Sequence, residues 1–337
     1  MALPSPFLPR RPYHAAFPSP ADARLDARTL ARIRFDASAS ADADPRDVVV
    51  ALPQMQETPL AEVWTSEHPV ETGWHEGIGY AHNGDVLFGQ LRVEESALAH
   101  PDHAAFRAYV RIDQLMQRFG YPCWLRVWNY FADIHRGGGD QERYRQFCVG
   151  RHKAMSLKPG FEQNLPAATV IGTEGSGLLI YFLAGRTPGI QVENPRQVSA
   201  FRYPREHGPV SPSFSRATLK HWADRAQLLV SGTASIVGHE SKHLDDAPAQ
   251  LVELKTNIRA LIDNAIAQHF RGAGADDVAA EGLKLYVRDR SVLDAVRSHL
   301  PKHFPARAPL LILQGDVCRR ELLVEVEGSY SMPEAWG

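Results

Sequence analysis

The chain alternates between short apolar runs, typical of strands, and longer segments with apolar residues at helical spacing. In the first half these patterns predict helices at residues 100–119 and 141–155, the first ending before Gly120. The predicted strands lie at residues 48–52, 86–93, 124–131, 168–172 and 178–183. The resulting order is strand, helix, strand, helix, strand, strand, preceded by the strand at 48–52.

The second half repeats this order. Strands are predicted at residues 227–232 and 283–288, and helices at 247–269 and 291–300. Residues 309–328 form two apolar runs around a polar turn, which predicts a β-hairpin that ends in a half-buried strand. The repeated order indicates an internal duplication.

The predicted fold class is α+β, with two units that each contain a mixed sheet with helices on one face. The other sheet face must be covered by the second unit or by another chain, and ligands usually bind in clefts between such units. We divide the chain into an extended segment 1–47, a first domain 48–190, a linker 191–225 and a second domain 226–337.

Charge and cysteine content exclude several classes of protein. The chain has 37 basic and 39 acidic side chains, so its net charge is too small to attract nucleic acid or an anionic membrane. Any anionic ligand must therefore be held by individual arginines. Cys123, Cys148 and Cys318 form no CxxC pair, which favours a reducing cytoplasm over a disulfide framework. The proline-broken N-terminus and the short apolar runs predict a soluble, cytoplasmic protein.

The last predicted strand contains an acidic residue between apolar neighbours. Strand alternation places Leu323, Glu325 and Glu327 on one face, so Glu325 is either solvated or partly buried with a raised pKa. Glu327 is expected to tolerate replacement by Gln.

Other polar positions offer binding groups. Tyr144 and Arg151 are two helical turns apart and share one face, although a solvated basic face explains them equally well. The linker is dense in Arg, Tyr and Ser at residues 193–204 and 211–216, and residues 231–238 offer backbone amides after a strand.

Metal and serine-hydrolase chemistry are not predicted. His239 and His243 lie in a polar loop without a fixed third ligand, so a solvated loop is favoured and no metal is expected. Ser231 and Ser235 lack the strand-turn-helix setting of a hydrolase nucleophile.

Two resemblances follow from these segments. The last 110 or so residues resemble the RidA (YjgF) family, whose fold is chorismate mutase-like. The residues that carry this resemblance are LLVSGTA at 228–234, Gln250, Asn257, PAR at 305–307 and VEVE at 324–327. Nearly the whole chain, from about residue 48, resembles the chorismatase family. The segments that carry this second resemblance are RVWNY at 126–130, RYRQFCVGR at 143–151, ENPRQVSA at 193–200, YP at 203–204, SPSFSR at 211–216 and GDVCR at 315–319.

The chorismatase resemblance implies two RidA-like units and an enzyme that removes the enolpyruvyl group of chorismate as pyruvate, without a cofactor. It implies 3-hydroxybenzoate as the product, with 4-hydroxybenzoate left open, for aromatic pigments, quinones or other secondary metabolites. Cleaving the enol ether needs a protonated acid at neutral pH, and Glu325 is expected to be that acid. The remaining expected site residues are Arg151 and Arg216 as carboxylate clamps, Tyr144 and Tyr203 as hydroxyl donors, Gly232 and Thr233 at the substrate, and Cys318 as the residue that sets the product.

Two other functions stay open. A RidA-type deaminase of reactive imines would use Arg307 and the VEVE strand, whereas a non-catalytic ligand-binding protein would keep the fold without the acid. The assembly is expected to be a homotrimer, as RidA units form, with a monomer that covers its own sheet faces as the alternative.

Overall fold

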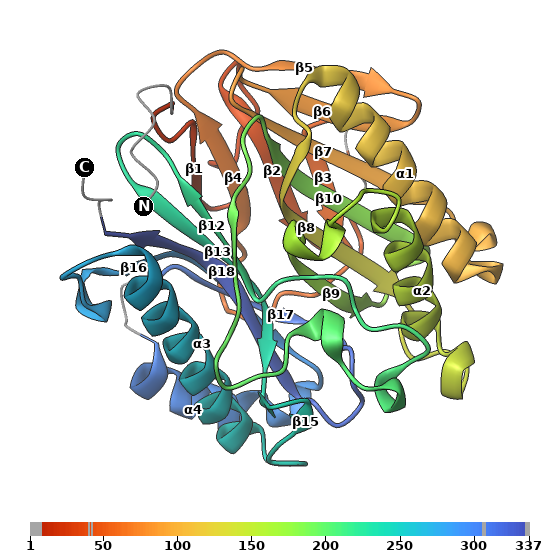
Figure 1. The fold of residues 1–337 in the computed structure, drawn as a ribbon, viewed down its shortest axis with the longest axis vertical. Helices are drawn as coiled ribbons and strands as arrows, with labels where there is room; N and C mark the ends of the chain where they lie inside the picture. The colour runs from red at the N-terminus through yellow and green to blue at the C-terminus, as the bar shows by residue number, and fades with distance from the viewer. Residues whose placement is uncertain (1–8, 40, 42, 305–307, 334–337) are drawn as a thin grey trace.

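The computed structural model of the chain describes residues 9–39, 41, 43–304 and 308–333. The described residues form three large sheets, two with six strands and one with four, besides a small two-stranded sheet, and helices cover the outer faces of the six-stranded sheets (Figure 1). The first six-stranded sheet has the strand order β5 (Glu71–His75), β6 (Ile78–His82), β7 (Val86–Val93), β10 (Leu178–Gly185), β8 (Cys123–Ala132) and β9 (Ala167–Thr173). The second has the order β11 (Ile190–Val192), β12 (Ala217–His221), β13 (Ala226–Ala234), β18 (Val324–Met332), β16 (Ala279–Val287) and β17 (Leu310–Gln314).

The two six-stranded sheets share one topology. In each, the fourth strand pairs antiparallel with its neighbours on both sides, and the last two strands pair parallel. The helices occupy matching places in the chain, namely α1 (Pro101–Phe119) and α2 (Arg143–Met155) in the first unit, and α3 (Ala247–His269) and α4 (Leu293–His303) in the second. The predicted α+β class and internal duplication are therefore confirmed.

The predicted hairpin at 309–328 is wrong. β17 and β18 do not pair with each other, because β16 lies between them and pairs parallel with β17 and antiparallel with β18. Two apolar runs joined by a polar segment do not by themselves reveal which strand is the neighbour. Here α4 carries the chain across to the parallel partner, as parallel pairing requires a long crossover.

The N-terminal segment also differs from the expectation that residues 1–47 are extended and precede the fold. It contributes β1 (Tyr13–Ala16), β2 (Thr29–Phe35) and the start of β3 (Asp47–Val50), which join β4 (Ala61–Ser66) in the four-stranded sheet. The Pro- and Ala-rich composition concealed the apolar alternation of TLARIRF in β2.

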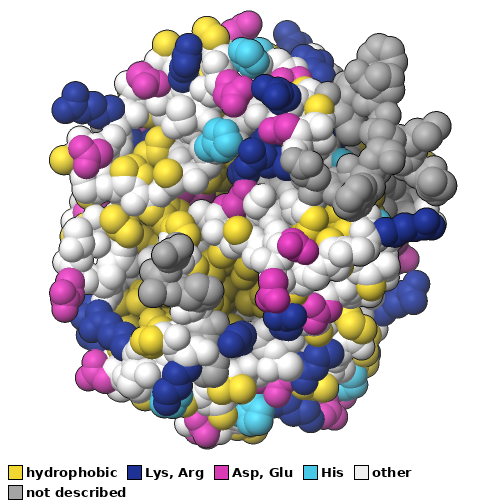
Figure 2. Space-filling model, turned by 90° about the vertical axis from the view of Figure 1, so that its left-hand side faces the viewer, with side chains coloured by type: hydrophobic (Ala, Val, Ile, Leu, Met, Phe, Trp, Pro, Cys, Tyr) yellow, Lys and Arg dark blue, Asp and Glu magenta, His cyan; other side chains and the backbone are white. Residues whose placement is uncertain are grey.

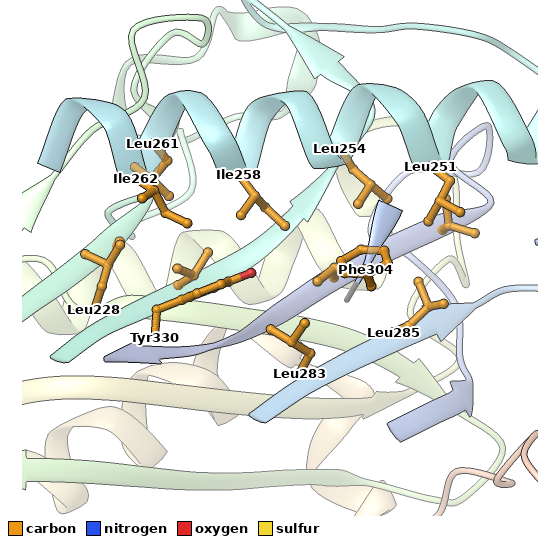
Figure 3. Packing of buried hydrophobic residues seen from close by; sticks show 14 of the residues in the cluster. Leu228, Leu251, Leu254, Ile258, Leu261, Ile262, Leu283, Leu285, Phe304 and Tyr330 are labelled. Carbon is orange, nitrogen blue, oxygen red and sulfur yellow. The ribbon is translucent and has the colours of Figure 1, made fainter. Parts of the chain in front are cut away.

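Three large hydrophobic clusters hold these layers together. One lies between α1, α2 and the first sheet, and another lies between α3, α4 and the second sheet. Figure 3 shows the second of these, where Leu254 and Ile258 of α3 face Leu283 of β16 and Tyr330 of β18. The central cluster combines side chains of all three sheets, so a single chain covers the open sheet faces.

The two units also meet along β9. Ala167 forms a parallel bridge with Ser215, and the backbone N–H of Ala168 donates to Ser231 Oγ at 2.8 Å. This contact brings the start of β12 and the end of β13 next to the first sheet. Part of the segment predicted as a linker, residues 191–225, is thus built into the second sheet as β12.

The surface carries charges of both signs in close mixture. On the face in Figure 2, Lys and Arg side chains alternate with Asp and Glu side chains around hydrophobic groups, as the near-balanced composition predicts. Among the described helices, none combines the length and the apolar character needed to cross a membrane.

Candidate active site

A cavity of about 240 Å³ lies where the first unit, the segment before β12 and the second unit meet. Arginines, tyrosines and carboxyl groups line it, a combination suited to a small anionic ligand. The lining residues are His135, Glu142, Tyr144, Arg145, Tyr203, His207, Pro212, Phe214, Arg216, Gly232, Ala234, Ile236, Cys318, Arg319, Arg320, Glu321 and Glu325.

A larger cavity, of about 380 Å³, lies beside the C-terminal end of α2 and is lined mainly by apolar groups. Its lysine, Lys158, is already bonded to Asp113. Because ligand sites need a few convergent polar groups, we take the smaller cavity as the candidate active site.

Glu325 lines the smaller cavity from β18, although only 4% of its surface is exposed. No hydrogen bond to its carboxyl group is found in the described part of the chain. Burial raises the pKa of Glu325 to about 8, and the nearby charge of Glu327 adds to this effect, whereas Arg126, Arg216 and Arg288 oppose it. The carboxyl group is therefore protonated at neutral pH.

A β-bulge places Gly232 against this carboxyl group. Val230 pairs with Gly328 and Thr233 pairs with Val326, so two residues of β13 lie opposite one residue of β18. A Cβ atom at Gly232 would collide with the Glu325 carboxyl group. The absence of a side chain at Gly232 therefore leaves room for the Glu325 carboxyl group.

Glu327, two residues along β18, has the opposite environment. Its buried carboxylate accepts hydrogen bonds from Thr169 Oγ1 at 2.5 Å and Tyr286 Oη at 2.6 Å, and it forms ion pairs with Arg126 and with Lys284. Burial opposes ionisation, but the two cations hold the pKa of Glu327 below its usual value. Glu327 is thus a buried structural anion, and the expectation that Gln would be tolerated there does not agree with these contacts.

The ion pairs continue into the N-terminal sheet. Lys284 Nζ lies 2.7 Å from Glu62 Oε2, and Trp64 Nε1 donates to Glu62 Oε1 at 2.8 Å. Two cations, Arg126 and Lys284, therefore balance the two carboxylates of Glu327 and Glu62. Because both of these cations are already paired with carboxylates, neither is a dedicated partner for an ionised Glu325, which is a second reason for its protonation.

Arg216 and Tyr203, two of the predicted binding residues, both line the cavity. Arg216 Nη2 donates to Tyr203 Oη at 2.7 Å and to the carbonyl oxygen of Val198 at 2.9 Å. Its guanidinium group also lies 5.4 Å from the ring centres of Tyr203 and Phe214. Arg216 Nε is buried and has no hydrogen-bond partner among the described residues, so the fixed guanidinium group retains a free donor there.

The other predicted binding residues divide into two groups. Tyr144 lines the cavity, and burial raises the pKa of its phenol well above the ordinary value. Arg151 and Thr233 are buried but are not lining residues. The Arg151 guanidinium group lies 5.3 Å from the Tyr109 ring centre, with Nε and Nη2 unpartnered, and Thr233 Oγ1 donates to the carbonyl oxygen of Ser231 at 2.9 Å.

Cys318 lies in the loop between β17 and β18, which is fixed from both units. Asp316 exchanges backbone hydrogen bonds with Gly172 of the first unit, and Arg288 of the second unit donates to the carbonyl oxygens of Val317 and Arg319. Burial raises the pKa of the Cys318 thiol to about 12, with a further contribution from Glu325. The thiol is therefore protonated and is a weak nucleophile.

Several lining residues were missed at the sequence level. Arg319 lies 5.3 Å from the ring centre of Tyr203, and Arg320 Nη2 donates to the carbonyl oxygen of His135 at 2.5 Å. Both arginines lie in the polar segment that was predicted to be the turn of a hairpin at 309–328, and Arg319 is the last residue of the GDVCR motif. Arg145 and His207 come from α2 and the linker, and no spacing rule connects them with β18.

Comparisons with known proteins identify the family of this chain. A family model described as chorismatase FkbO/Hyg5-like, N-terminal, matches residues 62–184. A 3-hydroxybenzoate synthase of Streptomyces hygroscopicus is 40% identical over 278 residues, covering 80% of this chain and 81% of the relative. The chain belongs to the chorismatase family.

Further chorismatases match over most of their length. A chorismatase of Streptomyces rapamycinicus is 38% identical over 296 residues, which cover 86% of this chain and 87% of the relative. A chorismatase crystal structure matches with a TM-score of 0.84 at 33% identity, covering 94% of this chain and 98% of that one. The resemblance to chorismatases is thus confirmed, and chorismatases are chorismate-cleaving enzymes.

Proposed function

We propose that this chorismatase converts chorismate into pyruvate and 3-hydroxybenzoate, with Glu325 as the general acid. The observation that carries the proposal is a carboxyl group kept protonated by burial in a cavity that also contains fixed guanidinium groups. Chorismate equals the sum of these two products in atoms, so the overall reaction consumes no water.

The proposed first step is proton transfer from Glu325 to the methylene carbon of the enolpyruvyl group. The adjacent carbon then becomes an oxocarbenium ion, and the C–O bond to the ring can break. A general acid works best when its pKa is near the working pH, and the pKa of about 8 for Glu325 meets this requirement. The carboxylate that remains after transfer is available to accept a proton from the ring as it becomes aromatic.

Two carboxylates on the substrate need cationic or donor-rich partners. We assign Arg216 to one of them, through its free Nε, with Tyr203 and Tyr144 as hydroxyl groups in the same cavity. Arg151 stays the proposed second clamp through its unpartnered nitrogens, although it is not a lining residue. Arg319 and Arg320 are further candidates for that role because they line the cavity.

Substrate binding also affects the acid. Arg216 and Arg288 lower the pKa of Glu325, which opposes protonation. A bound dianion offsets these positive charges and raises the pKa again. Protonation of the acid is therefore strengthened in the substrate complex.

Cys318 supports the assignment of an aromatic product. The chorismatase resemblance implies Cys at this position for hydroxybenzoate formers and Ala for those that release a dihydroxycyclohexadiene carboxylate. A relative 40% identical to this chain is named 3-hydroxybenzoate synthase. We propose 3-hydroxybenzoate as the product, formed by loss of pyruvate with rearrangement on the ring, and 4-hydroxybenzoate as a second product to be sought.

One assay distinguishes this function from the alternatives. Incubation with chorismate, followed by pyruvate detection and chromatography of the ring product, is expected to give pyruvate and 3-hydroxybenzoate in equal amounts. Turnover of 2-aminoacrylate without pyruvate release from chorismate would instead favour the RidA-type deaminase. That alternative relied on Arg307, which lies outside the described residues.

We further propose that the enzyme is a monomer. The alternative, a homotrimer, followed from the need to cover the open sheet faces, and in this chain the central cluster draws on all three sheets. A solution mass of one chain by light scattering is the expected result, and a mass of three chains would contradict it.

A further inference from the structure

Three side chains with metal-ligating atoms meet at the edge of the cavity. They are Glu206 and His207 of η5 (Arg205–His207) and His239 of the turn between β14 (Ile236–Val237) and β15 (Glu240–Ser241). His207 Nε2 lies 3.1 Å from His239 Nδ1, and Glu206 Oε1 lies 3.4 Å and 3.3 Å from these two nitrogens. The three atoms form a nearly equilateral triangle.

These separations agree with the geometry of a transition-metal ion. Imidazole nitrogens and carboxylate oxygens bind zinc at about 2.0–2.2 Å, so two ligands at a tetrahedral angle are about 3.3 Å apart. All three sides of the triangle lie close to this value. A single ion could therefore contact all three atoms without a change of backbone.

Hydrogen bonds fix the backbone at His207 and His239. Gly238, next to His239, donates to the carbonyl oxygen of Arg196 at 2.8 Å and accepts from the N–H of Val198 at 2.9 Å. Arg319 Nη1 donates to the carbonyl oxygen of His239 at 2.8 Å. On the other side, the N–H of His207 donates to the carbonyl oxygen of Pro204 at 3.1 Å.

The positive charge of Arg319 lies close to the proposed ligand His239. The arginine charge opposes a nearby cation, but it is turned to the backbone of His239 and to Ser241 Oγ. Glu206 adds a carboxylate that offsets part of this charge.

We propose that Glu206, His207 and His239 form a binding site for a divalent first-row transition-metal ion, with Zn²⁺ as the probe. Two imidazoles and a carboxylate are a ligand set for such ions and leave at least one coordination position open. The sequence offered His239 and His243 without a third ligand. The fold instead supplies His207 and Glu206 from the linker and turns His243 to Glu253, 3.1 Å away.

Zinc titration of the tag-free, chelator-treated full chain tests the proposal. Isothermal titration calorimetry is expected to give one Zn²⁺ ion per chain. His207→Ala and His239→Ala should each weaken binding by more than the ~10- to 100-fold that loss of an outer-shell partner costs. Glu206 is largely exposed, so Glu206→Gln is a variant whose folding is not at risk and should also weaken binding.

His243→Asn is the matched control. It changes a histidine four residues from His239 that is paired with Glu253, and Asn tolerates the positive φ of 56° at this position. We expect its zinc affinity to equal that of the parent. A parent protein that binds no zinc at micromolar concentrations, or a Glu206→Gln protein that binds it as tightly as the parent, would overturn the proposal.

Discussion

Glu325 and Glu327 lie two residues apart on the same buried strand, yet one carboxyl group is protonated and the other is ionised. Glu327 has two cationic partners and two hydroxyl donors, whereas Glu325 has no hydrogen-bond partner among the described residues. Desolvation therefore decides the state of Glu325, and ion pairing decides that of Glu327. This difference is the basis of the predictions for β18.

Replacing Glu325 by Gln should abolish pyruvate release while leaving chorismate binding nearly intact. The amide keeps the shape of the acid but does not protonate carbon, and loss of a general acid costs about 10²- to 10⁴-fold in rate. Pyruvate formation under saturating chorismate measures the effect. Glu240→Gln, an exposed change outside the cavity, is the control, and near-normal turnover by Glu325→Gln would refute the mechanism.

The pH dependence of the parent enzyme should follow the protonation of Glu325. Since its raised pKa is about 8, the acid is active below this pH, and kcat/KM should fall about tenfold per pH unit above it. The bound dianion raises the pKa further, so the fall in kcat should begin at a higher pH than the fall in kcat/KM. Rates measured between pH 6 and 10 check the fall in kcat/KM and the fall in kcat. An activity that increases through pH 8 would contradict the assignment.

Arg216→Ala should weaken chorismate binding by about 1.5–3 kcal/mol, the value of a charge-assisted pair. Arg216→Lys should recover only part of this, because an ammonium group lacks the planar fork of Arg. Equilibrium titration of the inactive Glu325→Gln protein isolates binding from chemistry. An unchanged dissociation constant in the alanine variant would mean that the substrate carboxylate lies elsewhere.

Arg151→Ala distinguishes a substrate clamp from a packing residue. If its unpartnered nitrogens bind the substrate, the loss of affinity should resemble that of Arg216→Ala. A variant with a normal KM and a lower urea midpoint would instead assign Arg151 to packing over Tyr109.

Cys318→Ala should shift the product from hydroxybenzoate toward the dihydroxycyclohexadiene carboxylate, with pyruvate release maintained. The thiol is protonated, so its proposed influence lies in shape and hydrogen bonding near the ring and not in nucleophilic attack. Chromatography of the ring products gives the ratio. An unchanged hydroxybenzoate fraction would make Cys318 a packing residue.

Glu327→Gln should destabilise the protein by about 3–5 kcal/mol, because it removes one partner from a buried ion pair and leaves Arg126 uncompensated. Urea unfolding measures the change in the free energy of unfolding. A variant as stable as the parent would show that the buried cations are compensated in another way.

The sequence predicted local structure better than pairing. The helix at 247–269 was located with its observed bounds, and Gly120 ends α1 in the left-handed conformation expected of a glycine cap. Periodicity reports which face of an element is buried, but not which strand lies beside it. The misplaced hairpin follows from this limit, whereas β2 was missed because the Pro- and Ala-rich composition around it concealed its apolar alternation.

In the candidate site too, local features were predicted from the sequence, whereas contacts between distant segments were not. Glu325, Arg216 and Cys318 came from motif resemblance and an acid on an apolar strand, and all three line one cavity. The ion pairs of Glu327 depend on Arg126, which is 201 residues away in the chain, and sequence spacing does not encode such contacts. The convergence of Glu206 and His207 with His239 was hidden for the same reason.

The duplicated fold has a consequence for how the centre of the molecule is constructed. Arg126 of β8 lies opposite Leu183 of β10, whereas Lys284 of β16, the strand that occupies the same place in the second sheet, lies opposite Glu327 of β18. In a ring of identical subunits, symmetry would place the same cation and the same carboxyl group in every subunit. Joining the units in one polypeptide breaks that symmetry, so two different cations can share a single carboxylate and one chain can carry one reactive acid.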